Sequence, residues 1–142
     1  MLVFFVRYIN YPYIFNKVII PKEVPIINTN EDIIQKNLSQ LVEQWIDSKA
    51  YIEPNITIIS VANTLGTNRT YLSAYINNNM HVNFNAWINI LRIEDAKILL
   101  KDNPELSMAD IAANLGYADH SSFCRQFKKY TDLSPTAWQN KA

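Results

Sequence analysis

One short pattern occurs twice in this chain and limits what it can fold into. Val61-Ala62-x-x-Leu65-Gly66 recurs as Ile111-Ala112-x-x-Leu115-Gly116. In each copy the apolar spacing is that of a helix, and the glycine then supplies a turn. A second amphipathic stretch follows each copy, with Leu72 and Ile76 in the first and Phe123 and Phe127 in the second. The pattern predicts two helix-turn-helix units and favours an all-α fold.

The stretch between the two copies has the periodicity of one longer helix. Asn83 is a capping residue, and Phe84, Trp87, Ile88 and Leu91 follow it at the spacing of a single helical face. A helix from about residue 84 to 100 would span about 25 Å at 1.5 Å per residue. We therefore expect a rigid linking helix between the two units.

Periodicity and capping residues together predict about seven helices and no convincing sheet. The expected elements are a helix from Asn30 to near Ser48, a loop at Tyr51–Asn55, a first helix-turn-helix at about 57–77, the linking helix, a second helix-turn-helix at about 107–130, and a last helix opening at Ser134-Pro135. The run Asn77-Asn78-Asn79 suits a helix end, and Ser107 to Asp110 resembles a capping box. The turn of the second unit is one residue longer than that of the first.

The first 30 residues differ from the rest of the chain. Residues 1–30 are rich in Tyr, Phe, Ile, Val and Pro, which predicts an extended N-terminal arm or the remnant of a preceding region, ahead of a domain at 31–142. The apolar start is interrupted by Arg7, Pro12 and Lys17 before the roughly 20 residues that a membrane-spanning helix needs. We therefore expect no membrane span and no signal peptide within this chain.

Composition excludes several classes of site. One cysteine and two histidines give no disulfide framework and no four-ligand zinc site, which fits a reducing cytoplasm. The only glycines, Gly66 and Gly116, serve turns, so no phosphate-binding loop is present, and no catalytic grouping stands at useful spacing. We expect no enzyme, cofactor or metal. Thirteen basic residues balance thirteen acidic ones, so the net charge is zero. If the chain binds nucleic acid, its basic side chains must be concentrated on one part of the surface.

A local concentration of basic side chains is predicted on the second helix of the second unit. With Phe123 facing inward and 100° per residue, Phe127 and Tyr130 return to the same side. The residues that fall on the opposite side or at the helix start are His120, Ser121, Arg125, Lys128 and Lys129. This group could meet phosphates and base edges together, with Arg125 the best candidate for a bidentate contact to guanine. The alternative is that these cations only solvate a surface helix.

The matching face of the first unit is polar but scarcely charged. With Leu72 and Ile76 inward, the outward residues are Thr70, Ser73, Ala74 and Asn77, flanked by Arg69 and Tyr71. These side chains can make hydroxyl, methyl and amide contacts with bases but supply little electrostatic affinity. The second unit is therefore expected to carry more of the charge-driven binding.

The chain from about Leu38 to Trp138 resembles the DNA-binding domain of the AraC/XylS family of bacterial transcription regulators. The most specific stretches are Leu91–Leu100 on the linking helix, Ile111-Ala112-x-x-Leu115-Gly116-Tyr117, Phe123-x-Arg125-x-Phe127-Lys128-Lys129-Tyr130, and Leu133-Ser134-Pro135-x-x-Trp138. The resemblance implies two helix-turn-helix subdomains that insert their second helices into the major groove of double-stranded DNA, about one helical turn apart. It also implies RNA polymerase as a partner.

In this family the base-reading positions would fall on Thr70, Ser73 and Ala74 in the first unit, and on His120, Ser121, Cys124 and Arg125 in the second. Where many members carry an arginine late on the first recognition helix, this chain has Ala74. The missing contact and the zero net charge predict modest affinity from one copy, strengthened by a homodimer or an appended region.

Two rival interpretations remain open. A helical interaction module could keep this fold and bind protein instead of DNA. A membrane-surface protein could be anchored by residues 1–20.

Overall fold

A computed structural model describes residues 29–142, which form seven α-helices, one short 3₁₀ helix and no strand. The elements are α3 (Thr29–Asp47), the 3₁₀ helix η1 (Ala50–Ile52), α4 (Ile58–Thr64), α5 (Arg69–Met80), α6 (Phe84–Asp102), α7 (Met108–Asn114), α8 (His120–Thr131) and α9 (Pro135–Lys141). The predicted all-α fold with two helix-turn-helix units and a linking helix is confirmed. Among residues 29–142, no helix has the length and apolar character needed to cross a membrane.

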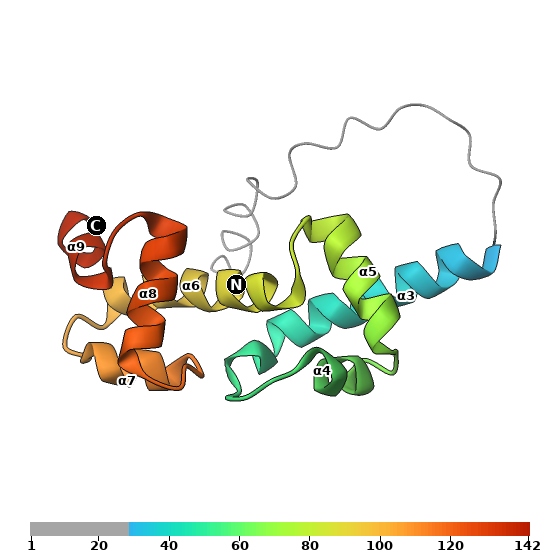
Figure 1. Ribbon diagram of the computed structural model, residues 1–142, viewed down its shortest axis with the longest axis horizontal. Coiled ribbons are helices and arrows are strands. Elements are labelled where there is room, and N and C mark those ends of the chain that lie inside the picture. Colours follow the sequence, from blue (N-terminus) through green and yellow to red (C-terminus); the bar gives the residue numbers. More distant parts are fainter. Residues whose placement is uncertain (1–28) are drawn as a thin grey trace, which may run out of the picture.

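Helix α6 runs through the middle of the molecule and joins two groups of helices (Figure 1). The first unit, α3 to α5 with η1, lies at its N-terminal half, and the second unit, α7 to α9, lies at its C-terminal half. Because each group of helices packs against its own stretch of α6, the linking helix contributes to two separate hydrophobic cores.

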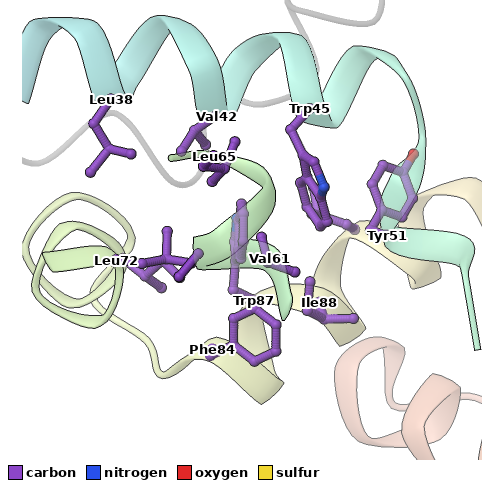
Figure 2. Packing of buried hydrophobic residues seen from close by; sticks show 13 residues of the cluster. Leu38, Val42, Trp45, Tyr51, Val61, Leu65, Leu72, Phe84, Trp87 and Ile88 are labelled. Atoms are coloured by element: carbon purple, nitrogen blue, oxygen red, sulfur yellow. The ribbon is translucent and has the colours of Figure 1, made fainter. Parts of the chain in front are cut away.

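The first core lies between α3, α4, α5 and the start of α6. Figure 2 shows Leu38, Val42 and Trp45 of α3 pointing toward the side chains of the other helices. The rings of Trp45 and Trp87 stack with their centroids 5.5 Å apart. Leu72 of α5, fully buried, closes the cluster from the other side. Apolar burial of this kind is the main force that holds short helices in place.

The second core is built around aromatic side chains of α8. Phe123 and Phe127 are fully buried against Ile93, Ala96 and Leu100 of α6. The ring of Trp138 on α9 packs edge-on against Phe127, with centroids 6.0 Å apart. The inward stripe expected for α8 is therefore confirmed, with Tyr130 half-buried at its end.

The predicted caps explain where the helices begin. Thr57 and Ser60 form a reciprocal capping box at α4, and the Asn83 side chain accepts from the Ala86 N–H at α6. Ser134 caps α9, with Pro135 at its first position. The second unit has the longer turn, from Leu115 to Asp119 against Leu65 to Asn68.

Four details differ from the sequence expectations. Helix α5 continues through the asparagine run to Met80, because Met80 packs on the first core and the Asn79 side-chain amide donates to the Tyr75 carbonyl (2.8 Å). The helix ends at His81, whose backbone is in the left-handed conformation. Helix α6 ends two residues later than expected, at Asp102. The Ser107 side chain caps α7 as predicted by accepting from the Asp110 N–H (3.1 Å), but its hydroxyl also donates to the Asp110 carboxylate (2.6 Å), so the second bond joins two side chains.

The fourth difference concerns the segment between α3 and α4. The start of the predicted loop is the 3₁₀ helix η1, whose Tyr51 is buried in the first core and donates from its hydroxyl to Asp95 (2.6 Å). The arm predicted for residues 1–30 lies outside the described residues, except that Thr29 and Asn30 belong to α3.

The two glycines have the same backbone conformation but different surroundings. Gly66 has φ +65° and Gly116 has φ +75°, a left-handed region that favours glycine. A Cβ added to Gly66 would meet nothing within 4 Å, whereas one added to Gly116 would lie 2.1 Å from the Ile52 carbonyl oxygen. Gly116 therefore marks a close approach between the turn of the second unit and η1 of the first.

This pair gives a matched test of that close approach. We expect Gly66→Ala to lower the free energy of unfolding by about 1–2 kcal/mol, the usual cost of a left-handed alanine. Gly116→Ala should cost about 1–3 kcal/mol more, because its methyl group overlaps backbone atoms that must move. Urea unfolding followed by circular dichroism measures both values, and equal losses in the two variants would contradict the close approach.

Candidate nucleic-acid interface

The start of α8 is set by Asp119, which caps the helix. The Ser122 N–H donates to the Asp119 carboxylate (2.6 Å), and this bond holds the pKa of the carboxyl below its ordinary value. The cap places His120 and Ser121 in the first turn of α8, where both are exposed. Polar groups at the first turn of such a helix stand where base edges are read in helix-turn-helix proteins.

The outer face of α8, defined as Ser121, Arg125, Lys128 and Lys129, is exposed along its whole length. The Arg125 guanidinium donates to the Ser122 hydroxyl (3.3 Å), so its side chain lies back toward the helix start. The ammonium of Lys129 lies 5.5 Å from the centre of the Tyr130 ring. Three cations therefore stand on the side of α8 opposite Phe123 and Phe127.

Cys124 lies between the buried side and the outer face. It is half-buried, and its Sγ is 3.3 Å from Nε2 of His120, one helical turn earlier. Burial raises the pKa of the Cys124 thiol, which keeps the group neutral at physiological pH. Across residues 29–142, the histidine, cysteine and carboxylate side chains form no group of three or more that could hold a metal ion.

The first unit presents a less charged surface. The Asn68 side chain caps α5 by accepting from the Tyr71 N–H (3.0 Å). A shallow open hollow on this helix is lined by Arg69, Thr70, Ser73, Ala74 and Asn77. These are the five positions predicted for DNA contact in this unit, and the structure gathers them on one surface. Arg69 is the single charged member of the set.

Sequence reasoning missed a polar cluster between the two units. Arg92 of α6 is buried and donates from Nε to the Tyr51 carbonyl (2.8 Å), from Nη1 to the Gly116 carbonyl (3.0 Å) and from Nη2 to the Glu53 carbonyl (2.9 Å). We call Arg92 and these three carbonyl groups the Arg92 junction. Burial lowers the pKa of Arg92 below its ordinary value, but an arginine in a protein stays protonated.

A signal for this junction does exist in the sequence. Arg92 and Asp95 fall on the apolar stripe of α6 that Ile88, Leu91 and Ala96 define. Charged residues on an inward stripe are seldom buried without partners, so they point to a polar contact inside the fold. The partners, however, come from distant segments and could not be named in advance.

The family comparison matches this architecture. A model of the helix-turn-helix domain family matches residues 61–141. The Escherichia coli K12 protein YkgA, whose name describes an HTH-type transcriptional regulator, is 35% identical over 115 residues, which cover 81% of this chain and 46% of that protein. The regulatory protein PocR of Salmonella typhimurium is 30% identical over 98 residues, 69% of this chain and 31% of that protein. The chain thus spans less than half the length of these relatives.

Solved structures show the same fold. The C-terminal domain of AraT, a response regulator from Geobacillus stearothermophilus, has a TM-score of 0.66 and 28% identity, covering 75% of this chain and 85% of that domain. The DNA-binding domain of the transcription factor AdpA, solved with a target DNA, has a TM-score of 0.64, covering 74% of this chain and 91% of that chain; at 15% identity it supports the fold alone. With the matched family model and the doubled unit around α6, this chain belongs to the helix-turn-helix domain family of the AraC type.

Proposed function

We propose that this chain binds double-stranded DNA with sequence specificity through α5 and α8 and thereby regulates transcription in a bacterium. The observation that carries the proposal is the outer face of α8, where three cations and a hydroxyl stand opposite two fully buried phenylalanines. A helix held by its inner side against a core can present such a face to the major groove. A chromosomal partner implies a cytoplasmic location.

The directions of the two helices support entry from one side of a duplex. In Figure 1, α5 and α8 both begin on the side of the molecule where α4 and α7 lie, and both run away from it. Their first turns, which carry the predicted base-reading residues, therefore lie toward the same side. Two recognition helices on one side would meet successive major grooves, about 34–36 Å apart along the duplex.

Each predicted residue has a role that its chemistry suits. We assign Arg125 to a bidentate contact with guanine, and His120, Ser121 and Cys124 to neighbouring base edges or methyl groups. Lys128 and Lys129, in the last turns of α8, are assigned to phosphates. In the first unit, Thr70, Ser73 and Ala74 would face bases, and Arg69 and Asn77 would flank them.

Relatives with longer chains suggest a larger context for this domain. YkgA and PocR, named as regulators, extend well beyond the matched region. We propose that further segments or a second copy of the chain raise the affinity of a domain whose net charge is zero. Contact with RNA polymerase is likewise a proposal, which rests on the family resemblance.

One observation favours a second candidate function. The first unit presents exposed Ile59 on α4 and exposed Tyr71 on the nearly neutral α5, a surface as suitable for protein as for DNA. A helical protein-interaction module with weak or absent DNA binding is therefore the alternative. Selection of duplexes from a randomised pool separates the two: the DNA-binding proposal requires recovery of a shared sequence, and failure to bind any duplex at low salt supports the module.

Loss of Arg125 tests the specific contact. On a duplex selected with the parent chain, we expect Arg125→Ala to weaken binding by about 1–3 kcal/mol and to relax the base preference at one position. Arg125→Lys should keep the charge yet lose the preference, because an ammonium cannot pair with guanine as a guanidinium fork does. Fluorescence anisotropy measures affinity, and unchanged binding by Arg125→Ala would count against this assignment.

Loss of a lysine tests the electrostatic part. Lys128→Ala should weaken binding about equally on all sequences and reduce the slope of log affinity against log salt by about 0.9, the share of one phosphate. Lys36→Ala on α3 removes the same charge from an exposed position in the first unit and is the control. The phosphate role fails if both variants give the parent slope.

The two units should contribute unequally. Because the α5 surface is mostly neutral, we expect Thr70→Ala with Ser73→Ala to leave the salt slope unchanged while affinity falls by about 1–3 kcal/mol. Titrations at several salt concentrations measure both quantities. A slope change as large as that of Lys128→Ala would show that α5 carries phosphate contacts of its own.

A further inference from the structure

Arg92 bonds to both units from the middle of the helix that links them. Two of its carbonyl partners, on Tyr51 and Glu53, belong to the segment that follows α3, and the third, on Gly116, belongs to the turn between α7 and α8. Its side chain is 8% exposed, so it is held inside the protein and away from any bound DNA. The Arg92 junction is thus a direct cross-link between the two units.

At this junction the backbone of the turn between α7 and α8 lies in close contact with the backbone of η1. The position of a Cβ on Gly116 would lie 2.1 Å from the Ile52 carbonyl oxygen and 3.1 Å from Nη2 of Arg92. The Ile52 side chain packs against both hydrophobic cores. Any rotation of one unit relative to the other would therefore have to break hydrogen bonds and disturb packing at the same place.

A tyrosine from each unit braces the junction against α6. The Tyr117 ring lies against the guanidinium, 5.3 Å from centroid to Cζ, and its hydroxyl donates to Asn89 (3.0 Å). Burial raises the pKa of Tyr117, so this hydroxyl keeps its proton at any physiological pH. On the other side, the Tyr51 hydroxyl donates to Asp95, which also pairs with Lys49 (3.3 Å).

We propose that Arg92 is a positioning residue that fixes the separation and relative rotation of α5 and α8, so that the chain accepts one spacing between its two DNA subsites. The proposal rests on the DNA-binding function proposed above. A planar guanidinium with donors in fixed directions can hold three carbonyl groups at once, which a single ammonium cannot do in the same way.

The consequence for DNA follows from the helical repeat. A duplex turns once in about 10–10.5 base pairs, so adding one pair rotates the second subsite by about 35°. Units joined by α6 alone could follow such a rotation by bending and twisting, since each core attaches to its own half of α6. Units held together by the Arg92 junction could not.

The first experiment measures the geometry of the protein without DNA. Spin labels are placed at Thr64 and Asn114, equivalent exposed positions of the two repeats, in a Cys124→Ser background. Double electron–electron resonance should give one narrow distance distribution for this parent. Arg92→Lys, which keeps the charge, and Gly116→Ala, which pushes the turn away from Ile52, should both broaden or shift it.

Two control variants separate the junction from general damage. Lys97→Gln breaks a half-buried pair with Glu94 on the same helix, and Gly66→Ala introduces the same backbone strain without a clash. Both should keep the parent distribution. A broad distribution in the parent overturns the proposal, and so does a parent-like distribution in Arg92→Lys that retains its helical circular dichroism. If Arg92→Lys loses that signal, Gly116→Ala decides.

The second experiment measures spacing on DNA, with a duplex selected by the unlabelled parent from a randomised pool. Inserting one base pair between the two subsites rotates the second subsite by about 35°. Parent affinity should fall by about 100-fold, the scale of losing one of two linked contacts. For Arg92→Lys the loss should shrink to about tenfold or less, with selected sites of more varied spacing.

The two experiments separate the two proposals. A parent that selects no duplex overturns the proposed function, while a narrow resonance distribution that depends on Arg92 still supports the positioning role in the free protein. A parent that binds DNA, paired with an Arg92→Lys variant that loses affinity equally on the altered spacing, overturns the positioning role alone.

Discussion

A single buried guanidinium makes two small helical units into one body. Each unit has its own core, and each core takes a different part of α6, so the fold could have been two domains on a common helix. Arg92 removes that freedom by bonding carbonyl groups on both sides of the linking helix. Burying a charge is costly unless its donors are satisfied, and here three directed hydrogen bonds offset the cost. The relative positions of α5 and α8 depend on this junction, together with the packing of Ile52 against both cores.

The duplicated pattern accounts for what the units share, and the outward residues account for how they differ. Leu72 and Ile76 in α5 occupy the same inward places as Phe123 and Phe127 in α8, and all four are fully buried. The outer face of α8 is strongly cationic, whereas the hollow on α5 is lined by one arginine and small neutral side chains. The two units therefore pack in the same way but differ in their exposed side chains. The cationic α8 can supply electrostatic affinity for DNA, and the mostly neutral α5 can supply contacts that depend less on salt.

Local patterns predicted most of the fold because they express local physics. Thr57, Asn83 and Ser134 cap their helices as the sequence indicated, since a capping bond needs only residues close in the chain. The sequence predicts that α5 ends at Asn77, three residues before its observed end at Met80. The prediction is wrong because the packing of Met80 on the first core outweighs the low helix propensity of the asparagines before it. The Arg92 junction was missed because a helical wheel treats one helix at a time, while its carbonyl partners lie 24 to 41 residues away. The roles of the DNA-contacting residues stay predictions, although the structure shows how exposed their side chains are and which residues lie next to them.

Residual dipolar couplings of backbone amides in the free chain test most directly whether the two units form one body. The couplings of residues 58–80 and of 108–131 are each fitted to an alignment tensor. If the Arg92 junction holds in solution, the two tensors will agree in magnitude and orientation, and one tensor will fit all the couplings with the structure as it stands. Two tensors of clearly different magnitude would mean that the units move independently about α6, which would contradict the central claim.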